Sequence, residues 1–253
     1  MAKSRSTVAN VPPTILRELN AGTRATRNLV EGLAIDFRLL IQSLHQDWPP
    51  RELARLAPGI PITRRMAAAA ELLLACPEWD AFDQWRNHPS DTVRGWICFV
   101  VGQLPRLTLR QRLVKIRPLA DDSHFGVREW AWLAVRGHLA AEVTAAIRLL
   151  TPWTESKSEN LRRFACEALR PRGVWCAHLE ELKAEPELAL PILEPLRADA
   201  SCYVQNSVGN WLNDAGKTQP HWVRDLCRRW QRESPGPPTD YICRRGLRNV
   251  GME

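Results

Sequence analysis

The sequence has almost none of the signals that mark β-structure or a membrane protein. It contains no Asn-Gly or Asp-Gly dipeptide and no sustained alternation of apolar and polar residues. No run approaches the roughly 18 consecutive apolar residues that a transmembrane helix needs. The polar N-terminus lacks the apolar core of a signal peptide. These absences predict an all-α protein that does not associate with a membrane.

Paired cysteine motifs are also missing. The seven cysteines include no C-x-x-C pair, and their odd number favours reduced thiols in a cytoplasmic protein. Cys176 and His178 are two residues apart and have the chemistry of metal ligands, but no second pair lies at zinc spacing. We therefore expect no metal site and no cofactor.

The charge is unevenly distributed along the chain. With 45% hydrophobic and 25% charged residues, the composition is that of a globular protein with a real core. The formal net charge of +7 favours a polyanionic partner. Basic residues prevail in 1–30 and 222–248, whereas acidic residues prevail in 180–199. This segregation is typical of a protein with one basic and one acidic surface.

A repeat runs through the second half of the chain. Each copy has a polar loop, then an apolar anchor followed by Arg or Gln, then an amphipathic helix; the anchors are Val93, Val127, Leu161 and Val204. Leading helices lie between the copies, and a single two-helix unit cannot bury its own apolar face. The pattern predicts an α-α superhelix, or solenoid, of HEAT-like two-helix repeats. Residues 1–13 are expected to form a flexible leader, and residues 14–253 a single repeat domain.

Arginine is concentrated on the inner helices of these repeats. A concave face lined with arginine suits a DNA duplex, because neutralising phosphates supplies most sequence-independent affinity. Alternatively, the arginine after each anchor belongs to the repeat itself and pairs with an aspartate of the next unit. Four arginines around one helix exceed what the repeat needs: Arg162, Arg163, Arg170 and Arg172. A protein–protein scaffold would instead carry an acidic or apolar inner face.

Two segments carry a family resemblance. The stretches LRRFACEALRPRGVW and YVQNSVGNWLNDAGK resemble motifs of the HEAT-like DNA alkylation-repair glycosylases, in particular the AlkC branch, which is related to AlkD. The stretches LNAGTRATRNLVEGLAIDF and YICRRGLRN resemble the first and closing helices of that branch. Gly173 and Val174 stand where the family has Leu-Pro, and Trp211 stands where it often has His, which leaves the choice of lesion open.

The resemblance implies a monofunctional DNA glycosylase that excises cationic N3- or N7-alkylated purines, such as 3-methyladenine and 7-methylguanine, without base flipping. Trp175 matches the family's tryptophan that packs against the deoxyribose of the lesion, and Asp214 matches its Asn-Asp aspartate. The second acid is harder to place. His124 occupies the aligned position, Glu129 lies one turn beyond Phe125, and Trp132 is a further candidate for the slot.

The expected chemistry accounts for these residue types. Loss of a cationic base leaves a sugar with positive charge at C1′, which carboxylates and an aromatic face stabilise. We therefore predict catalytic roles for Asp214, Glu129 and Trp175. The predicted DNA contacts are Trp130, Trp132, Arg128, Arg162, Arg163, Arg170, Arg172, Asn206, Asn210, Asn213 and Lys217.

Several alternatives stay open. Asp214 can simply pair with Lys217, and Glu129 with Arg136. Trp130 and Trp132 point about 200° apart on a helix, so at least one is expected in the core. The protein can also be a non-catalytic HEAT-repeat binder of damaged or branched DNA. We expect a monomer in the cytoplasm, associated with the nucleoid when bound to double-stranded DNA with alkylated bases.

Overall fold

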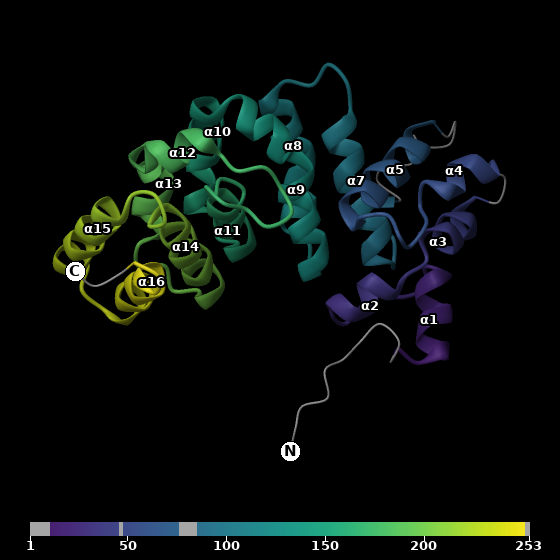
Figure 1. Cartoon of the computed structure of the whole chain (residues 1–253), viewed down its shortest axis with the longest axis horizontal. Helices are drawn as coiled ribbons and strands as arrows, with labels where there is room; N and C mark the ends of the chain where they lie inside the picture. The colour runs from purple at the N-terminus through teal and green to yellow at the C-terminus, as the bar shows by residue number, and fades with distance from the viewer. Residues whose placement is uncertain (1–10, 46–47, 76–84, 251–253) are drawn as a thin grey trace. The chain divides into compact units, whose positions relative to one another are not determined.

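The computed structural model describes residues 11–45, 48–75 and 85–250, and every regular element within those ranges is helical (Figure 1). The helix α1 begins at Pro13. Proline suits the first helical position, because a backbone N–H there would have no partner within the helix and proline has none. Of the predicted leader, residues 1–10 lie outside the described ranges, so its flexibility stays a prediction. No helix in these ranges has both the length and the apolarity to cross a bilayer.

The chain divides into two compact units. The N-terminal unit comprises residues 1–106 and 123–131, and the C-terminal unit comprises residues 107–122 and 132–253. The expectation of one repeat domain with a concave face stays a prediction.

The helices of each unit follow in chain order. The N-terminal unit holds α1 (Pro13–Asn20), α2 (Leu29–Ala34), α3 (Phe37–Leu44), α4 (Pro50–Ala54), α5 (Ile62–Ala75), α7 (Asp91–Gln103) and the start of α9 (Phe125–Ala141). The C-terminal unit holds α8 (Leu109–Ala120), the rest of α9, α10 (Val143–Leu150), η3 (Thr151–Glu155), α11 (Glu159–Glu167), α12 (Glu180–Ala184), η4 (Pro186–Ala189), α13 (Leu190–Leu193), η5 (Glu194–Leu196), α14 (Cys202–Ala215), α15 (Pro220–Glu233) and α16 (Pro237–Leu247).

The four repeat anchors each lie near the start of an inner helix. Val93, Val127 and Val204 have no exposed surface, and Leu161 is 4% exposed. They belong to α7, α9, α11 and α14, at the third residue of each helix. The predicted all-α fold of HEAT-like two-helix repeats is confirmed.

The residue after each anchor fastens the loop that precedes its helix. Arg94 donates to the His88 carbonyl over 2.6 Å, Arg128 to Ser123 over 2.9 Å, and Arg162 to Ser156 over 2.9 Å. Gln205 makes the equivalent bond to the carbonyl of Asp199, over 2.7 Å. The bonds of Arg94, Arg162 and Gln205 are buried or partly buried, where carbonyls require such partners, and that of Arg128 is exposed. The Arg or Gln of the repeat therefore has a structural role in all four copies.

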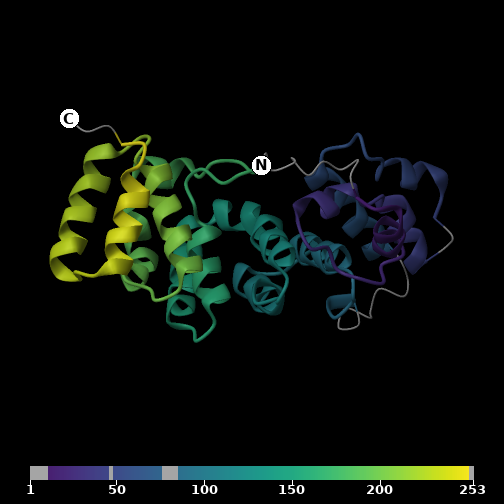
Figure 2. The same ribbon diagram turned by 90° about the horizontal axis from the view of Figure 1, so that it is seen from below.

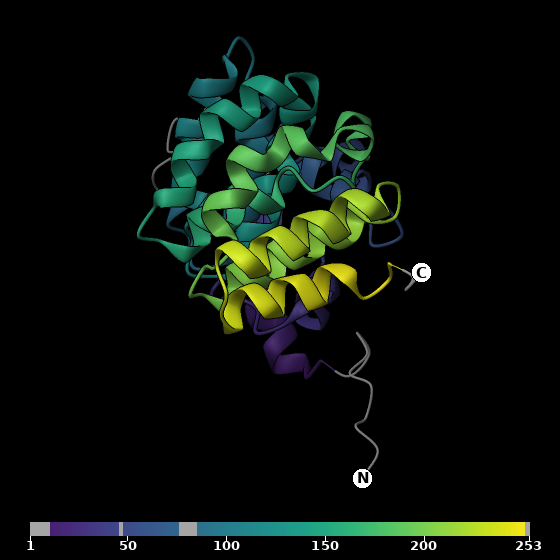
Figure 3. The same cartoon turned by 90° about the vertical axis from the view of Figure 1, so that its left-hand side faces the viewer.

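In the C-terminal unit, α14 packs against α11 and α16. Figures 2 and 3 show the yellow helix α16 alongside the yellow-green helices of the same unit. Two glycines permit the close approach of α14 and α16. A Cβ on Gly209 would lie 2.8 Å from the Arg245 side chain, and one on Gly246 would lie 2.8 Å from Cβ of Leu212. The contact fixes the position of α14, which carries Asp214.

Candidate functional site

Two carboxylates and their partners form an ionic cluster between α11 and α14. We call it the Asp214 cluster, and it consists of Arg163, Glu167, Arg170, Ser207, Asp214 and Lys217. Arg170 donates to Oδ2 of Asp214 through Nε (2.9 Å) and Nη2 (2.7 Å). Lys217, two residues beyond α14, donates to Oδ1 over 3.2 Å. Both oxygens of Asp214 are thus bound to cations.

The second carboxylate of the cluster is Glu167, the last residue of α11. Its Oε1 accepts from Nη1 of Arg170 over 2.7 Å, and its Oε2 accepts from Ser207 over 2.5 Å. A nitrogen of Arg163 lies 3.6 Å from Oε2. Burial opposes the ionisation of Glu167, but Arg163 and Arg170 outweigh it and hold the pKa of this carboxyl below its usual value. Glu167 is therefore an anion at neutral pH.

Arg170 lies between the two carboxylates and bonds to both. Burial disfavours its charge, but the nearby Glu167 and Asp214 outweigh this and raise the pKa of the guanidinium further above its usual value. Its side chain is only 13% exposed, as expected for a planar donor that is held by two acids. Arg170 is thus permanently charged and held in one orientation.

A buried arginine fixes the loop that follows Arg170. Arg136 of α9 is 3% exposed and donates to the carbonyls of Ala168 (2.8 Å), Arg170 (2.6 Å) and Ala177 (3.3 Å). Burial is the main cause that lowers the pKa of its guanidinium. A further bond joins the Leu179 amide to the Pro171 carbonyl over 3.0 Å. The segment 171–179, which we call the Trp175 loop, is therefore closed at its base.

Trp175 occupies an unusual backbone conformation in this loop. Its φ of 60° lies in the left-handed region, which residues other than glycine rarely adopt. The side chain is 55% exposed, although a large indole is normally buried. Backbone strain of this kind costs about 1–3 kcal/mol and tends to occur at functional sites. Trp175 follows Arg170 by five residues, so the loop anchored at Arg170 carries it.

In the N-terminal unit, a different polar cluster surrounds His124. Nε2 of His124 lies 2.7 Å from the Thr26 carbonyl, and Nδ1 accepts from the Gly126 amide over 3.1 Å. Asp91 accepts from the amide and the hydroxyl of Thr26, over 2.8 and 2.9 Å. These bonds join three segments that are far apart in the sequence. His124 thus acts as the residue that precedes and orders the start of α9.

The residues predicted for the site are divided between the two units. Arg128, Glu129 and Trp130 belong to the N-terminal unit. Trp130 is half-buried there and packs on Gly95, where a Cβ would lie 2.6 Å from the indole. Glu129 is also half-buried. The remaining predicted residues belong to the C-terminal unit, where the structure brings Arg163, Arg170, Asp214 and Lys217 together in the Asp214 cluster.

Two predicted DNA contacts, Trp132 and Asn213, have buried side chains, and their contact with DNA stays a prediction. Trp132 is 3% exposed and belongs to the core, as expected for one of the two neighbouring tryptophans. Asn213 is 2% exposed, donates to the Gly246 carbonyl over 3.2 Å and accepts from Asn249 over 3.2 Å. Neither residue presents a side chain to a partner in this conformation.

Other predicted contacts are engaged within the protein but remain partly exposed. Asn206 accepts from the hydroxyl of Tyr241 over 2.7 Å, and Asn210 accepts from Arg245 over 3.0 Å. Arg162 binds Asp199 through two nitrogens, over 2.6 and 3.0 Å, which is the pairing with the next unit left open by the sequence. The guanidinium of Arg163 lies 4.4 Å from the centroid of the Tyr203 ring, and Arg172 is half-buried.

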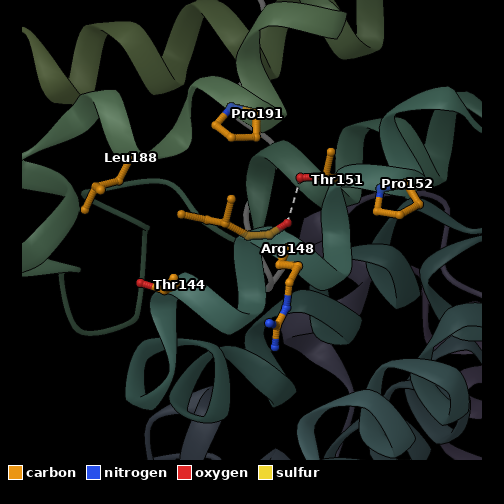
Figure 4. Close-up of a pocket in the computed structure, with 7 residues that line it drawn as sticks. Thr144, Arg148, Thr151, Pro152, Leu188 and Pro191 are labelled. Atoms are coloured by element: carbon orange, nitrogen blue, oxygen red, sulfur yellow. Dashed lines mark hydrogen bonds between the residues drawn. The ribbon is translucent and has the colours of Figure 1, made fainter.

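The cavity drawn in Figure 4 lies elsewhere in the C-terminal unit. It measures about 440 Å³ and lies between α10, η3, η4 and α13. Thr144, Arg148, Leu188 and Pro191 contribute to its lining, and the hydroxyl of Thr151 donates to the Ile147 carbonyl over 2.8 Å. No residue predicted for the site contributes to it. The Asp214 cluster remains the candidate site on chemical grounds.

Sequence reasoning missed two residues of this region as site residues. The sequence assigns no site role to Glu167, and it indicates Arg136 only as a possible partner of Glu129. Arg163 and Arg170 are local partners of Glu167, but Ser207 is 40 residues away, and the carbonyls that Arg136 binds are 32–41 residues away, so local spacing does not reveal that either residue is buried in the cluster region. The RPR motif that follows Glu167 offered an indirect signal, because a buried acid is a natural partner for arginine.

Comparison with known proteins places these motifs within one matched region. The model of the DNA alkylation repair enzyme family matches residues 126–235, which include Glu129, Trp175 and Asp214. The uncharacterized protein YhaZ of Bacillus subtilis (strain 168) is 38% identical over 135 residues, which are 53% of this chain and 36% of that protein. The chain therefore spans about a third of the length of this relative.

Two solved structures share the fold. The alkylpurine DNA glycosylase AlkC of Pseudomonas fluorescens, bound to DNA with an abasic site analog, superposes with a TM-score of 0.68 at 24% identity, over 98% of this chain and 65% of that one. AlkD2 of Streptococcus mutans superposes with a TM-score of 0.60 at 20% identity, over 75% of this chain and 90% of that one. Residues 126–235 of this chain match the DNA alkylation repair enzyme family, and the chain shares its helical-repeat fold with AlkC and AlkD2.

Proposed function

We propose that this protein is a monofunctional DNA glycosylase that releases cationic N3- and N7-alkylated purines, such as 3-methyladenine and 7-methylguanine, from duplex DNA without flipping the base. The observation that carries the proposal is the Asp214 cluster next to the Trp175 loop. A carboxylate held among arginines is joined through Arg170 to a loop that exposes a tryptophan. The family match over residues 126–235 includes both residues.

The reaction breaks the bond between C1′ of the deoxyribose and N9 of the alkylated purine. The electron pair leaves with the base, which becomes neutral, and the sugar becomes an oxocarbenium-like cation. Water then adds to C1′ and loses a proton to a carboxylate or to solvent. Because the base leaves as a neutral molecule, no general acid is required. Stabilisation of the positive sugar is the main task of the protein.

The proposed catalytic groups meet this requirement in three ways. Asp214 supplies negative charge beside the sugar, and Glu129 supplies a second carboxylate that orients the attacking water. Trp175 supplies an electron-rich face that attracts the cationic sugar. Arg172 and Lys217 bind the DNA phosphates on either side of the damaged nucleotide.

Lys217 controls access to Asp214 in this proposal. The carboxylate is 4% exposed, and Lys217 binds its Oδ1, while the side chain of Lys217 itself is 45% exposed. A phosphate competes directly for this ammonium group, because both acceptors are anions. When Lys217 turns to the phosphate, Oδ1 becomes available to the sugar. DNA binding would thus uncover the carboxylate that acts on the lesion.

The burial of Asp214 also supports a second candidate function. Because each oxygen of Asp214 is already paired, the cluster also suits a protein that binds damaged or branched DNA without excising a base. In that case Asp214 only joins α14 to α11. The two functions share the predicted dependence on DNA and differ only in catalysis.

The test is single-turnover release of 3-methyladenine and 7-methylguanine from methylated duplex DNA, with Asp214→Asn and Glu129→Gln run beside the wild type. We expect release by the wild type and its loss in Asp214→Asn with DNA affinity retained. Reduced release by Glu129→Gln would assign the second acid to Glu129. A wild type that binds the DNA but releases no base from a panel of alkylated duplexes would leave the non-catalytic function.

A further inference from the structure

The buried Glu167 has no place in the mechanism above, although it shares Arg170 with Asp214. We propose that Glu167 is a positioning residue that divides the charge of Arg170 between two carboxylates, so that Asp214 keeps the negative field that a cationic sugar requires. The inference rests on the proposed function for its biological meaning, but its charge claim is testable without catalysis.

The geometry shows how the division works. Arg170 uses Nη1 for Glu167, over 2.7 Å, and Nε and Nη2 for Oδ2 of Asp214, over 2.9 and 2.7 Å. The planar fork therefore has one edge on each acid. Ser207 and Arg163 hold Glu167 from its other side. Arg170 can turn toward neither acid without losing the other.

The charges of the cluster make Glu167 necessary to that field. Once Lys217 has turned to a phosphate, Arg163 and Arg170 remain against Glu167 and Asp214, so two cations balance two anions. Arg136 adds a cation nearby, but it faces backbone carbonyls. Without Glu167, Asp214 alone would balance the arginines, and the net charge at the site would rise by one unit. A more positive site repels the sugar cation that it has to stabilise.

Stability alone does not explain a carboxylate at this position. Glu167 is the last residue of α11, where the partial negative charge of the helix C-terminus disfavours an anion. It is 4% exposed, and burying an acid with its partners is often no more stable than an apolar replacement. A buried ion pair in an unfavourable place fits a role in tuning charge.

The experiment compares the affinity of the protein for two duplexes that differ by one charge. One duplex carries a pyrrolidine in place of the sugar at an abasic position, which is cationic at neutral pH and imitates the oxocarbenium ion. The other carries the neutral tetrahydrofuran analogue. The ratio of the two dissociation constants cancels general DNA affinity and reports the field at the sugar. Base release by the wild type is measured separately.

We expect the wild type to prefer the cationic duplex by about tenfold. Glu167→Gln keeps the shape and an oxygen that accepts from Arg170, and its NH2 group can donate to the Ser207 hydroxyl. In this variant the preference should fall to within about twofold. Ser207→Ala should retain most of it, because this variant removes a hydrogen bond and no charge. Glu187→Gln is the matched control, since it removes the same charge from an exposed position of the same unit.

Each outcome of this experiment either supports or overturns the inference about Glu167. A Glu167→Gln variant that folds and keeps the wild-type preference overturns the inference, as does a wild type with no preference at all. Loss of the preference in Glu187→Gln would show that total charge, and not Glu167, sets the ratio. If the wild type prefers the cationic duplex but releases no base, the proposed function fails while the inference about Glu167 stands. Proportional loss of thermal stability and preference in both Glu167→Gln and Ser207→Ala would reduce Glu167 to a structural role.

Discussion

Asp91 and Asp214 are equally buried, each 4% exposed, yet they differ in every partner. Asp91 is bound by neutral donors, the amide and hydroxyl of Thr26, with His124 3.4 Å away. Asp214 is bound by Arg170 and Lys217. Asp91 is the first residue of α7, and Asp214 is the last but one of α14. Their helices therefore present opposite dipole ends to the two acids.

This difference separates a structural acid from a candidate functional one. At a helix N-terminus an anion is stabilised by the helix dipole, so Asp91 is where folding alone would place it. At a helix C-terminus the dipole opposes an anion, and Asp214 requires two cations to be held there. Glu167, at the C-terminus of α11, repeats the unfavourable arrangement. Two acids placed against their helix dipoles in one cluster indicate selection for charge and not for stability.

The sharpest way to break the comparison is Asp214→Asn. We expect base release to fall by about 100- to 1,000-fold, as when a group that stabilises transition-state charge is removed. The free energy of unfolding should change by only about 1 kcal/mol, because the amide still accepts from Arg170 and the unfavourable charge at the helix end is gone. Single-turnover release and urea denaturation measure the two quantities. If the Asp214→Asn variant unfolds readily but keeps its rate of base release per folded molecule, Asp214 has a structural role, like Asp91.

Asp91→Ala should show the reverse pattern. It leaves the amide and hydroxyl of Thr26 without their acceptor, and buried donors without partners cost about 1–3 kcal/mol. We expect the urea midpoint to fall accordingly, with base release per folded molecule unchanged. Asp91→Asn keeps an acceptor and should lose less. If Asp91→Ala abolishes release at full stability, the N-terminal cluster contributes to function directly.

The backbone of the Trp175 loop offers a smaller test. At φ 60° glycine is free of the strain that any side chain brings, so Trp175→Gly should be more stable than Trp175→Ala by about 1 kcal/mol. The neighbouring Val174, which is 58% exposed and has no positive φ, provides the control, because there alanine should be the more stable. Thermal unfolding of the four variants checks the order. If the alanine variant is more stable than the glycine variant at both positions, the backbone of Trp175 is not strained in solution.

The sequence was sufficient for the repeats and for part of the site. Spacing predicted the buried anchors, because the pattern of a repeat is local. The same periodicity showed that Trp130 and Trp132 point apart, but only packing decides that Trp132 is the buried one. The sequence predicts a DNA contact for Asn213, because it cannot show that the amide bonds to the Gly246 carbonyl of α16, 33 residues away. For the same reason the polar face of α11 did not reveal that Glu167 is buried and shares Arg170.

Lys217 permits the finest comparison, since it is the exposed partner of Asp214, whereas His124 is the enclosed neighbour of Asp91. If Lys217 moves to a phosphate, Lys217→Gln should weaken DNA binding several-fold and reduce the slope of log affinity against log salt by about 1. Arg228→Gln, which removes an exposed cation paired with Asp225 on α15, should leave the slope unchanged. Titrations of a duplex at four salt concentrations measure both slopes. Equal slopes for Lys217→Gln and the wild type would mean that Lys217 stays on Asp214, and Oδ1 would then remain covered during any reaction.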